Sequence, residues 1–251
     1  MNRSLWAVAA PGSPAVSSIS PPSAWPAIEA ALSAPGPRQA VERLRDEGLV
    51  AIVMPELAAL FGVPQPPRSH PEIDAGLHSL MTLEQAGLLT ADPVLRFGAL
   101  VHDVGKGVTP RSEWPRHKGH EERGVPLVDQ LCRRLGAPED YRLFGMLAAR
   151  GHGLAHKAAE LRPGTLLDLL ESCGPLDDPA GIERLIVVAW ADKRGRTGFE
   201  HVGYPPAAAL REARAAAADE PEQPASSLRH RRLRALAQLR GVLAEAAAQE
   251  D

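Results

Sequence analysis

The stretch FGALVHDVGKGV, residues 97–108, decides both the fold and the candidate site. A helical apolar run ends in an adjacent imidazole and carboxylate, His102 and Asp103, and a Gly-Lys-Gly turn follows. Neighbouring side chains on a helix point in different directions, so this pair could hold one metal ion or reach two ions from one helix end. His-Asp dipeptides are common, so the prediction depends on partners elsewhere in the chain.

Composition favours helices around this stretch. Apolar residues make up 44% of the 251 residues and aromatic residues only 4%, so the core must consist mainly of Leu, Ala and Val. Ala and Leu are strong helix formers, and runs of β-branched residues are scarce. The chain shows no useful strand-period alternation and no internal repeat. We therefore predict an all-α bundle.

Composition also divides the chain into four parts. Residues 1–23 are rich in Pro, Ser, Ala and Gly and are expected to form a disordered leader. We expect a short helical segment over 24–67, the main domain over 68–206 and C-terminal helices over 207–251. Apolar periodicity and Gly or Pro breaks predict a loop over 105–118, with helices over 27–33, 38–47, 53–61, 71–89, 93–102, 119–135, 138–150, 163–172, 179–193, 207–218 and 225–249.

Net charge and cysteine content limit the partners and the cellular compartment that we expect for the protein. The net charge of −3 provides no broad basic field, so a nucleic-acid partner would need a local patch. Cys132 and Cys173 each lie in an apolar helical pattern and are expected to be buried, reduced thiols, which favours the cytoplasm. No apolar run approaches the roughly 18 residues that a membrane span requires.

Histidines and aspartates around the His-Asp pair predict a metal site. Seven of the nine histidines fall between His70 and His156. The set His78, His102, Asp103 and Asp192 would balance the charge of a divalent ion, and its mixed N and O ligands suit Mn, Fe, Co, Ni or Zn. A second ion could lie between His120 and His152 with Asp103 as a bridge, and His156 is a further candidate, although Gly151 and Gly153 weaken a helix there.

Each of these residues also has a purely structural interpretation. His78 could be a hydrogen-bonded core residue, and Asp192 could form a surface ion pair with the basic residues that follow it. Asp103 could face solvent at a helix C-terminus, although the helix dipole disfavours a carboxylate there and so favours a bound cation. His117 is expected to be a loop histidine.

Basic residues near the predicted ligands could bind phosphate. Lys106 lies between two glycines that would allow close backbone approach, and Arg116 lies in the following loop. Arg194 and Arg196 come directly after Asp192 and could clamp a phosphate in a bidentate manner. The alternatives are a solvated turn lysine and a charged helix end. The densest basic run, residues 229–234, is expected to be a solvated helix start.

These motifs resemble those of a known family. The spacing His78…His102-Asp103…Asp192 resembles the HD superfamily of metal-dependent phosphohydrolases. Over about residues 25–206 the chain is similar to the C-terminal half of bacterial multifunctional CCA-adding enzymes, which are tRNA nucleotidyltransferases with an HD domain. The similarity is most specific in LFGVP (60–64), HPEID (70–74), residues 97–110, WPRH (114–117) and RGRTGFE (194–200).

The resemblance implies an all-α HD-domain bundle with 2′,3′-cyclic phosphodiesterase, 2′-nucleotidase and phosphatase activity. Nothing in the sequence supplies the Gly-Ser motif and the Asp-x-Asp pair that the nucleotidyltransferase head carries on a sheet, since the chain begins with the Pro- and Ser-rich stretch, so we expect no CCA addition. The family often has Asp after the later histidine, where this chain has Gly153, so one ion is the simpler expectation and two remain an alternative. Magnesium is a further candidate beside the transition metals.

Three functional hypotheses follow. The first is a phosphohydrolase acting on phosphorylated nucleotides or RNA 3′ ends, in which metal-held hydroxide attacks phosphorus, Lys106 and the arginines stabilise charge, and Asp103 and His120 take part in catalysis. The second is a tRNA- or protein-binding body with a structural metal. The third is an HD nucleotide hydrolase of another specificity. The sequence predicts no oligomeric state.

Overall fold

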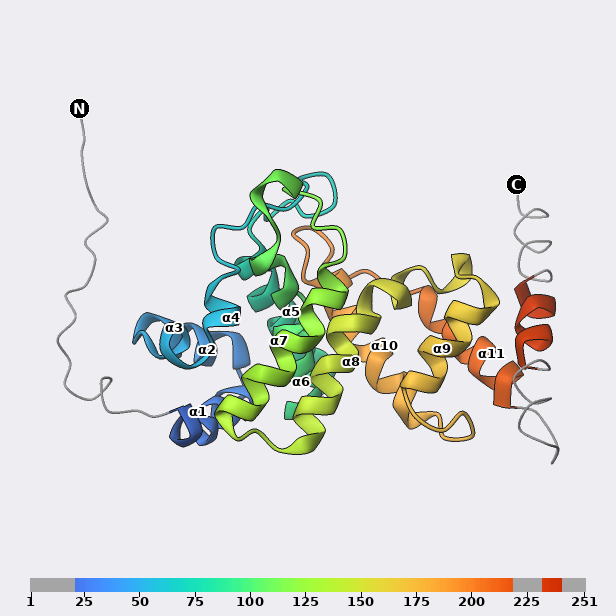
Figure 1. The fold of residues 1–251 in the computed structure, drawn as a ribbon, viewed down its shortest axis with the longest axis horizontal. Coiled ribbons are helices and arrows are strands. Elements are labelled where there is room, and N and C mark those ends of the chain that lie inside the picture. Colours follow the sequence, from blue (N-terminus) through green and yellow to red (C-terminus); the bar gives the residue numbers. More distant parts are fainter. Residues whose placement is uncertain (1–20, 219–231, 241–251) are drawn as a thin grey trace.

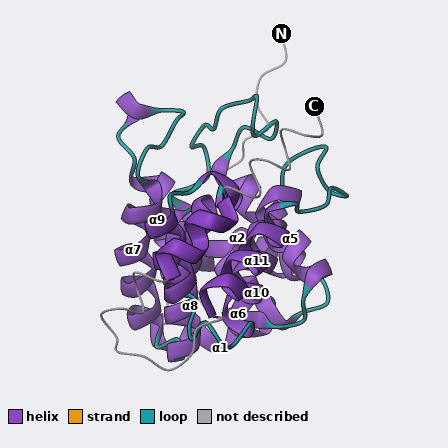
Figure 2. Cartoon of the chain, turned by 90° about the vertical axis from the view of Figure 1, so that its right-hand side faces the viewer, coloured by secondary structure: helices purple, strands orange, loops and turns teal. Residues whose placement is uncertain are grey.

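The computed structural model describes residues 21–218 and 232–240, and nearly all regular structure in these ranges is helical (Figures 1 and 2). An isolated bridge between Pro64 and Asp74 is the exception within that part of the chain. The predicted all-α fold is therefore confirmed. The elements are α1 (Pro21–Ser33), α2 (Pro37–Asp46), α3 (Leu49–Val53), α4 (Pro55–Ala58), α5 (Ala75–Leu89), α6 (Pro93–Val101), η1 (Val104–Val108), η2 (Arg111–Glu113), α7 (His120–Leu135), α8 (Glu139–His156), η3 (Ala158–Glu160), α9 (Pro163–Ser172), α10 (Ala180–Arg194) and α11 (Pro206–Ala218), and residues 232–240 are also helical.

Two hydrophobic cores flank the pair formed by α8 and α10. The first core joins α1–α7 to one side of this pair, and Phe144 of α8 and Val188 of α10 belong to it. The second core joins the pair to α9 and α11, and Ala155 of α8 and Leu185 of α10 belong to it. Figure 1 shows the same order, with α1–α7 on the left, α8 and α10 in the middle, and α9 and α11 on the right. Both middle helices can therefore present side chains at the junction of the two cores.

The N-terminal helices are anchored to the main bundle by one buried cation and three aromatic rings. Arg96 of α6 donates hydrogen bonds to the carbonyls of Leu32 and Ala34, at 2.8 and 3.0 Å, where α1 ends. Trp25 packs edge-on against Phe97 and Tyr141, with centroid distances of 5.9 and 4.8 Å. This segment is thus packed against the helix that carries the His-Asp pair.

Several helix boundaries differ from those predicted. α5 begins at Ala75 and not at residue 71, because Asp74 caps it by accepting a hydrogen bond from Leu77 N at 2.9 Å. The segment predicted as one helix over 53–61 is divided at Met54, where the backbone leaves the helical region. The predicted loop over 105–118 contains the short 3₁₀ segments η1 and η2. α8 continues through Gly151 and Gly153 to His156.

Three predictions about the ends of the chain and the cysteines have mixed outcomes. The predicted leader extends to residue 23, but α1 already includes residues 21–23, and residues 1–20 lie outside the described ranges. Of the helix predicted over 225–249, and of the basic run 229–234, only the parts within 232–240 are described. Cys132 is buried as expected, whereas Cys173 is half-buried. None of the described helices has the length and apolar character needed to cross a membrane.

Candidate metal centre

The first turn of α5 places His78 at the centre of the fold. Its Nδ1 lies 2.9 Å from Glu72 Oε1, and its Nε2 lies 3.0 Å from Asp192 Oδ1 and 3.9 Å from Asp103 Oδ2. The side chain is fully buried. Asp74 holds this arrangement in place, because its second carboxylate oxygen accepts a hydrogen bond from Gly62 N and ties the helix start to the preceding loop.

The His-Asp pair ends α6 inside the protein. His102 Nδ1 donates a hydrogen bond to Ala99 O at 2.8 Å, which leaves Nε2 with a free lone pair, 3.1 Å from Asp103 Oδ2. Asp103 is 1% exposed, so the alternative of a solvent-facing helix-end carboxylate is wrong. Lys106 Nζ donates to Asp103 Oδ2 and to Gln65 Oε1, both at 2.5 Å.

Two further histidines approach the other oxygen of Asp103. Its Oδ1 lies 3.1 Å from His120 Nε2 and 3.5 Å from His152 Nε2, and these two nitrogens are 3.4 Å apart. Both rings are oriented by backbone carbonyls, since His120 Nδ1 donates to His117 O at 2.9 Å and His152 Nδ1 donates to Ala148 O at 3.0 Å. Each ring therefore directs Nε2 towards Asp103.

Asp192 closes the arrangement from α10. One oxygen faces His78, and the other accepts a hydrogen bond from His156 Nε2 at 2.6 Å. The His156 ring contacts the Tyr204 hydroxyl through Nδ1 at 3.2 Å, and Arg196 lies 3.4 Å from Asp192. Asp192 is 2% exposed, so the alternative of a surface ion pair is wrong. We call His78, His102, Asp103, His120, His152 and Asp192 the His/Asp cluster.

The donor set of the His/Asp cluster fits a divalent transition metal. Within the described residues, His102 Nε2 and Asp103 Oδ1 are buried and have no hydrogen-bond partner. Among the described residues, four groups of three donors have ligand atoms within 4.8 Å of one another, and three of them lie wholly within the cluster: His78, His102 and Asp103; His102, His152 and Asp192; and Asp103, His120 and His152. The fourth joins His78 to His70 and Glu72. Such mixed imidazole and carboxylate sets suit Mn, Fe, Co, Ni or Zn, and two of the groups share Asp103.

Electrostatics prepare the two aspartates and His102 for a cation, whereas at His78 a metal ion would have to displace a proton. Burial raises the pKa values of Asp103 and Asp192, but the neighbouring histidines and cations outweigh it and hold both pKa values well below the usual range. Burial lowers the pKa of His78, but Asp192 and Glu72 outweigh it and raise this pKa to about 8. Burial lowers the pKa of His102, which favours the neutral imidazole that binds metals.

Comparison with known sequences agrees with this geometry. Residues 76–196 match the sequence model of the HD domain. The chain contains an HD domain. HD domains form a family of metal-dependent phosphohydrolases. The matched range lies inside the segment 68–206 that we expected to form the main domain.

Curated relatives of this HD-domain chain are bacterial proteins named Multifunctional CCA protein. The one from Methylococcus capsulatus is 47% identical over 212 residues, which are 83% of this chain and 49% of that protein. The proteins from Thioalkalivibrio sulfidiphilus and Nitrosococcus oceani are 48% and 50% identical over 80% and 79% of this chain, and each match covers 49% of the relative. The chain therefore spans about half the length of the curated relatives it matches.

A cavity of about 530 Å³ opens beside the His-Asp pair, His102 and Asp103. Asp103, His120, His152 and Asp192 of the His/Asp cluster line it, together with Lys106. Lys106 is only 7% exposed, so it is not a solvated turn lysine. The adjacent Gly105 is required for packing and not for contact with a ligand, since a Cβ there would lie 1.9 Å from His120 O.

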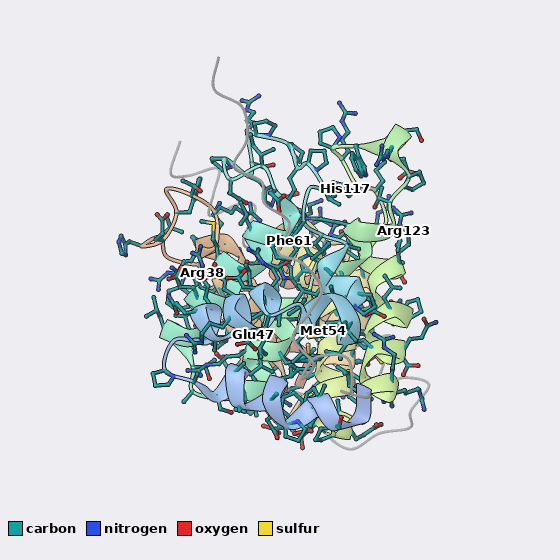
Figure 3. The ribbon with its side chains drawn as sticks, turned by 90° about the vertical axis from the view of Figure 1, so that its left-hand side faces the viewer. Arg38, Glu47, Met54, Phe61, His117 and Arg123 are labelled. Atoms are coloured by element: carbon teal, nitrogen blue, oxygen red, sulfur yellow. The ribbon has the colours of Figure 1, made fainter. Side chains whose placement is uncertain are left out.

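Two predicted phosphate-binding residues do not line this cavity. Arg116 is exposed in the loop that precedes α7. Arg194 donates through Nε to Val202 O at 3.0 Å, and its guanidinium stacks on Trp190, because the helix turns this side chain away from Asp192. His117, labelled in Figure 3, is a loop residue as predicted, but it is buried and donates to Pro64 O at 2.8 Å.

The structure adds residues to which the sequence suggested no role. Glu72 touches His78, and Gln65 holds Lys106. Both lie in the irregular segment before α5, where no periodic pattern indicates which side chains point inward. Other additions line the cavity: His70, Glu121, Lys157, Lys193 and Tyr204. The motif HPEID marked the segment that contains His70 and Glu72, but sequence spacing alone did not distinguish their roles.

Proposed function

We propose that this HD domain hydrolyses 2′,3′-cyclic phosphates and 2′-phosphates of nucleotides or RNA 3′ ends. The observation that carries the proposal is the convergence of four imidazoles and two buried carboxylates beside a buried lysine. The lysine, both carboxylates and two of the imidazoles, His120 and His152, line one cavity. The multifunctional CCA relatives support the same substrate class. The proposal includes tRNA as a natural substrate.

The residues of the His/Asp cluster would hold the metal ions that the reaction requires. His78, His102, Asp103 and Asp192 would hold one ion, and His120 and His152 would hold a second with Asp103 as a bridge. A bound divalent ion would supply a water of lowered pKa and would stabilise charge on the phosphoryl oxygens. Hydrolysis adds the water oxygen to phosphorus, breaks one P–O bond to the ribose and delivers a proton to the ribose oxygen that leaves. That bond is a ring bond in a 2′,3′-cyclic phosphate and the ester bond in a 2′-phosphate.

Positive charge and proton transfer come from the chain itself. Lys106 and Arg196 both reach the cavity and would stabilise the negative charge that grows on the phosphoryl group. His120 directs Nε2 towards Asp103 at the cavity wall. In the one-ion arrangement His120 is placed to protonate the leaving oxygen, and in the two-ion arrangement it is a ligand.

Turnover of 2′,3′-cyclic AMP by the purified protein with Mn, Ni or Mg tests the proposal. His102→Ala and Asp103→Ala should each lower kcat/KM by at least about 1,000-fold, because each removes a donor at the centre of the cluster. Arg133→Gln, on the exposed face of α7, is the matched control and should keep the wild-type rate. Wild-type turnover that survives both cluster substitutions would show that another site does the chemistry.

A further inference from the structure

Three cations lie on the cavity wall away from the Asp103–Lys106 pair. Lys157 directly follows α8, and Lys193 and Arg196 lie at the C-terminal end of α10. All three line the cavity that contains the His/Asp cluster. Lys193 is held by Phe199, since its ammonium lies 4.4 Å from the ring centroid. Because α8 and α10 both end here, two separate helix ends bring these cations to one region.

These cations exceed the acidic groups available to them. Arg196 pairs with Asp192 at 3.4 Å, but its Nε is buried without a hydrogen-bond partner. Neither Lys157 nor Lys193 forms an ion pair within the described residues. Asp103 pairs with Lys106, so Asp192 and Glu121 are the acidic residues on this wall that remain for the three cations. A surplus of cations in a concave site attracts an anion, and phosphate is the anion that the proposed reaction already brings to the cavity.

We propose that Lys157 and Lys193 form a second phosphate subsite, which we call the rim subsite. The inference rests on the proposed function, because it places the scissile phosphate at the His/Asp cluster. The preferred substrate then carries another phosphate on the 5′ side of the same nucleoside. Gly203, Tyr204 and Pro205 line the same cavity and provide an uncharged surface for the sugar and base between the two phosphates.

Two sources share this chemistry. One is a free nucleotide with a 5′-phosphate monoester, and the other is an RNA 3′ end, whose last nucleoside is joined through a 5′-phosphodiester. Three substrates separate them: 2′,3′-cyclic AMP, its 5′-phosphorylated form, and the dinucleotide ApA with a terminal 2′,3′-cyclic phosphate. If the dinucleotide is also preferred over 2′,3′-cyclic AMP, the natural ligand is an RNA end. If only the 5′-phosphorylated nucleotide is preferred, the natural ligand is a free nucleotide.

The test compares kcat/KM of the metal-loaded full chain for these substrates. At low salt we expect at least one of the two substrates with an additional 5′ phosphate group to be preferred over 2′,3′-cyclic AMP by about tenfold, mainly through KM. In the double variant Lys157→Gln/Lys193→Gln this ratio should fall to about one, because the charges are lost while the side-chain size is kept. Lys118→Gln, an exposed loop lysine outside the cavity, is the matched control and should retain the ratio.

Failure of this inference is distinguishable from failure of the proposed function. Equal kcat/KM for all three substrates, or a preference that survives the double substitution, overturns the rim subsite and leaves the phosphohydrolase intact. If the metal-loaded protein hydrolyses none of them, the proposed function fails. The three compounds can then be used as unreactive ligands, and calorimetry measures their Kd values. The rim subsite stands if a 5′ phosphate group lowers the Kd and the double variant removes that difference.

Discussion

At the scale of single residues, backbone carbonyls prepare the imidazoles of the HD domain for metal binding. In His102, His120 and His152 a carbonyl accepts a hydrogen bond from Nδ1, so the lone pair of each neutral ring is at Nε2 and faces the cluster. His78 differs, because the carboxylate of Glu72 and not a carbonyl lies beside its Nδ1. The orientation of His78 is therefore the one that a single side-chain substitution can disturb.

Replacement of Glu72 tests this dependence. Glu72→Ala should weaken Mn binding by about 10- to 100-fold, because His78 loses the partner that orients its ring and raises its basicity. Glu72→Gln keeps an acceptor oxygen, so its Kd for Mn should lie between those of the wild-type protein and Glu72→Ala. Isothermal titration calorimetry measures the Kd, and Glu160→Ala, at an exposed position at the end of η3, is the control. An unchanged Kd in Glu72→Ala would contradict the assigned role.

The raised pKa of His78 predicts a pH dependence in the metal-free protein. The pKa rises from about 6.5 in the unfolded chain to about 8 in the folded one. The stabilising effect of the protonated ring is therefore complete below pH 6.5 and is lost as the pH rises through 8. The pKa of His152 is also raised, by Asp103 against the effect of burial, and acts in the same direction.

Urea unfolding in EDTA measures this effect. The free energy of unfolding should fall by about 2 kcal/mol between pH 6 and 8.5 from the His78 contribution. Saturating metal should remove or reverse the slope, because the metal requires the deprotonated ring. The lowered pKa values of His70, His102 and His117 act in the opposite direction, so the His78 contribution is read from the difference between the wild-type protein and His78→Asn. Identical profiles in the two proteins would show that His78 does not carry this proton.

At the scale of elements, close approach between η1 and the start of α7 positions both Lys106 and His120. Gly105→Ala would place a Cβ 1.9 Å from His120 O, against backbone that cannot move without displacing α7. We expect a loss of about 3 kcal/mol or more in unfolding free energy, or failure to fold. Gly164→Ala in the first turn of α9, where a Cβ meets no atom within 4 Å, is the control and should be neutral or slightly stabilising.

The helices themselves were largely predictable, and the exceptions have local causes. Asp92 and Pro93 mark the start of α6 as expected, since the Asp92 side chain accepts from Val94 N. The predicted end of α8 at residue 150 was wrong because tertiary packing overrides the glycine penalty. A Cβ on Gly151 would lie 3.2 Å from Leu185, so the glycine lets α8 approach α10 closely. Because α8 stays helical to its end, His152 and His156 lie one turn apart on one helical face.

At the scale of the whole molecule, a bound metal would join both halves of the bundle. The His/Asp cluster draws its ligands from α5, α6, α7, α8 and α10, and α8 and α10 belong to both hydrophobic cores. Binding to the folded state alone adds about 2.7 kcal/mol of stability when the free metal is at 100 times its Kd. For a chain of this size such a gain raises Tm by about 5–10 °C.

Thermal unfolding with added Mn or Zn checks this expectation, and EDTA should reverse the increase in Tm. His102→Ala should show little or no increase, because it removes a ligand shared by two of the donor groups. Arg133→Gln should behave as the wild-type protein does. A metal-induced increase of equal size in His102→Ala would place the binding site elsewhere.

The sequence by itself determined the helical class and the identity of the candidate ligands. Composition and periodicity depend on local propensity, and His78, His102, Asp103 and Asp192 stand out by residue type and spacing. Only the tertiary structure decided which basic residues reach the cavity. Arg194 and Arg196 are two residues apart, yet one stacks on Trp190 and the other faces Asp192. Arg194 is held by Trp190 and by Val202 O, in the segment that follows α10. The packing of α8 against α10 brings Lys157 and Lys193 to one wall, because positions at two helix ends meet only through contacts between distant segments.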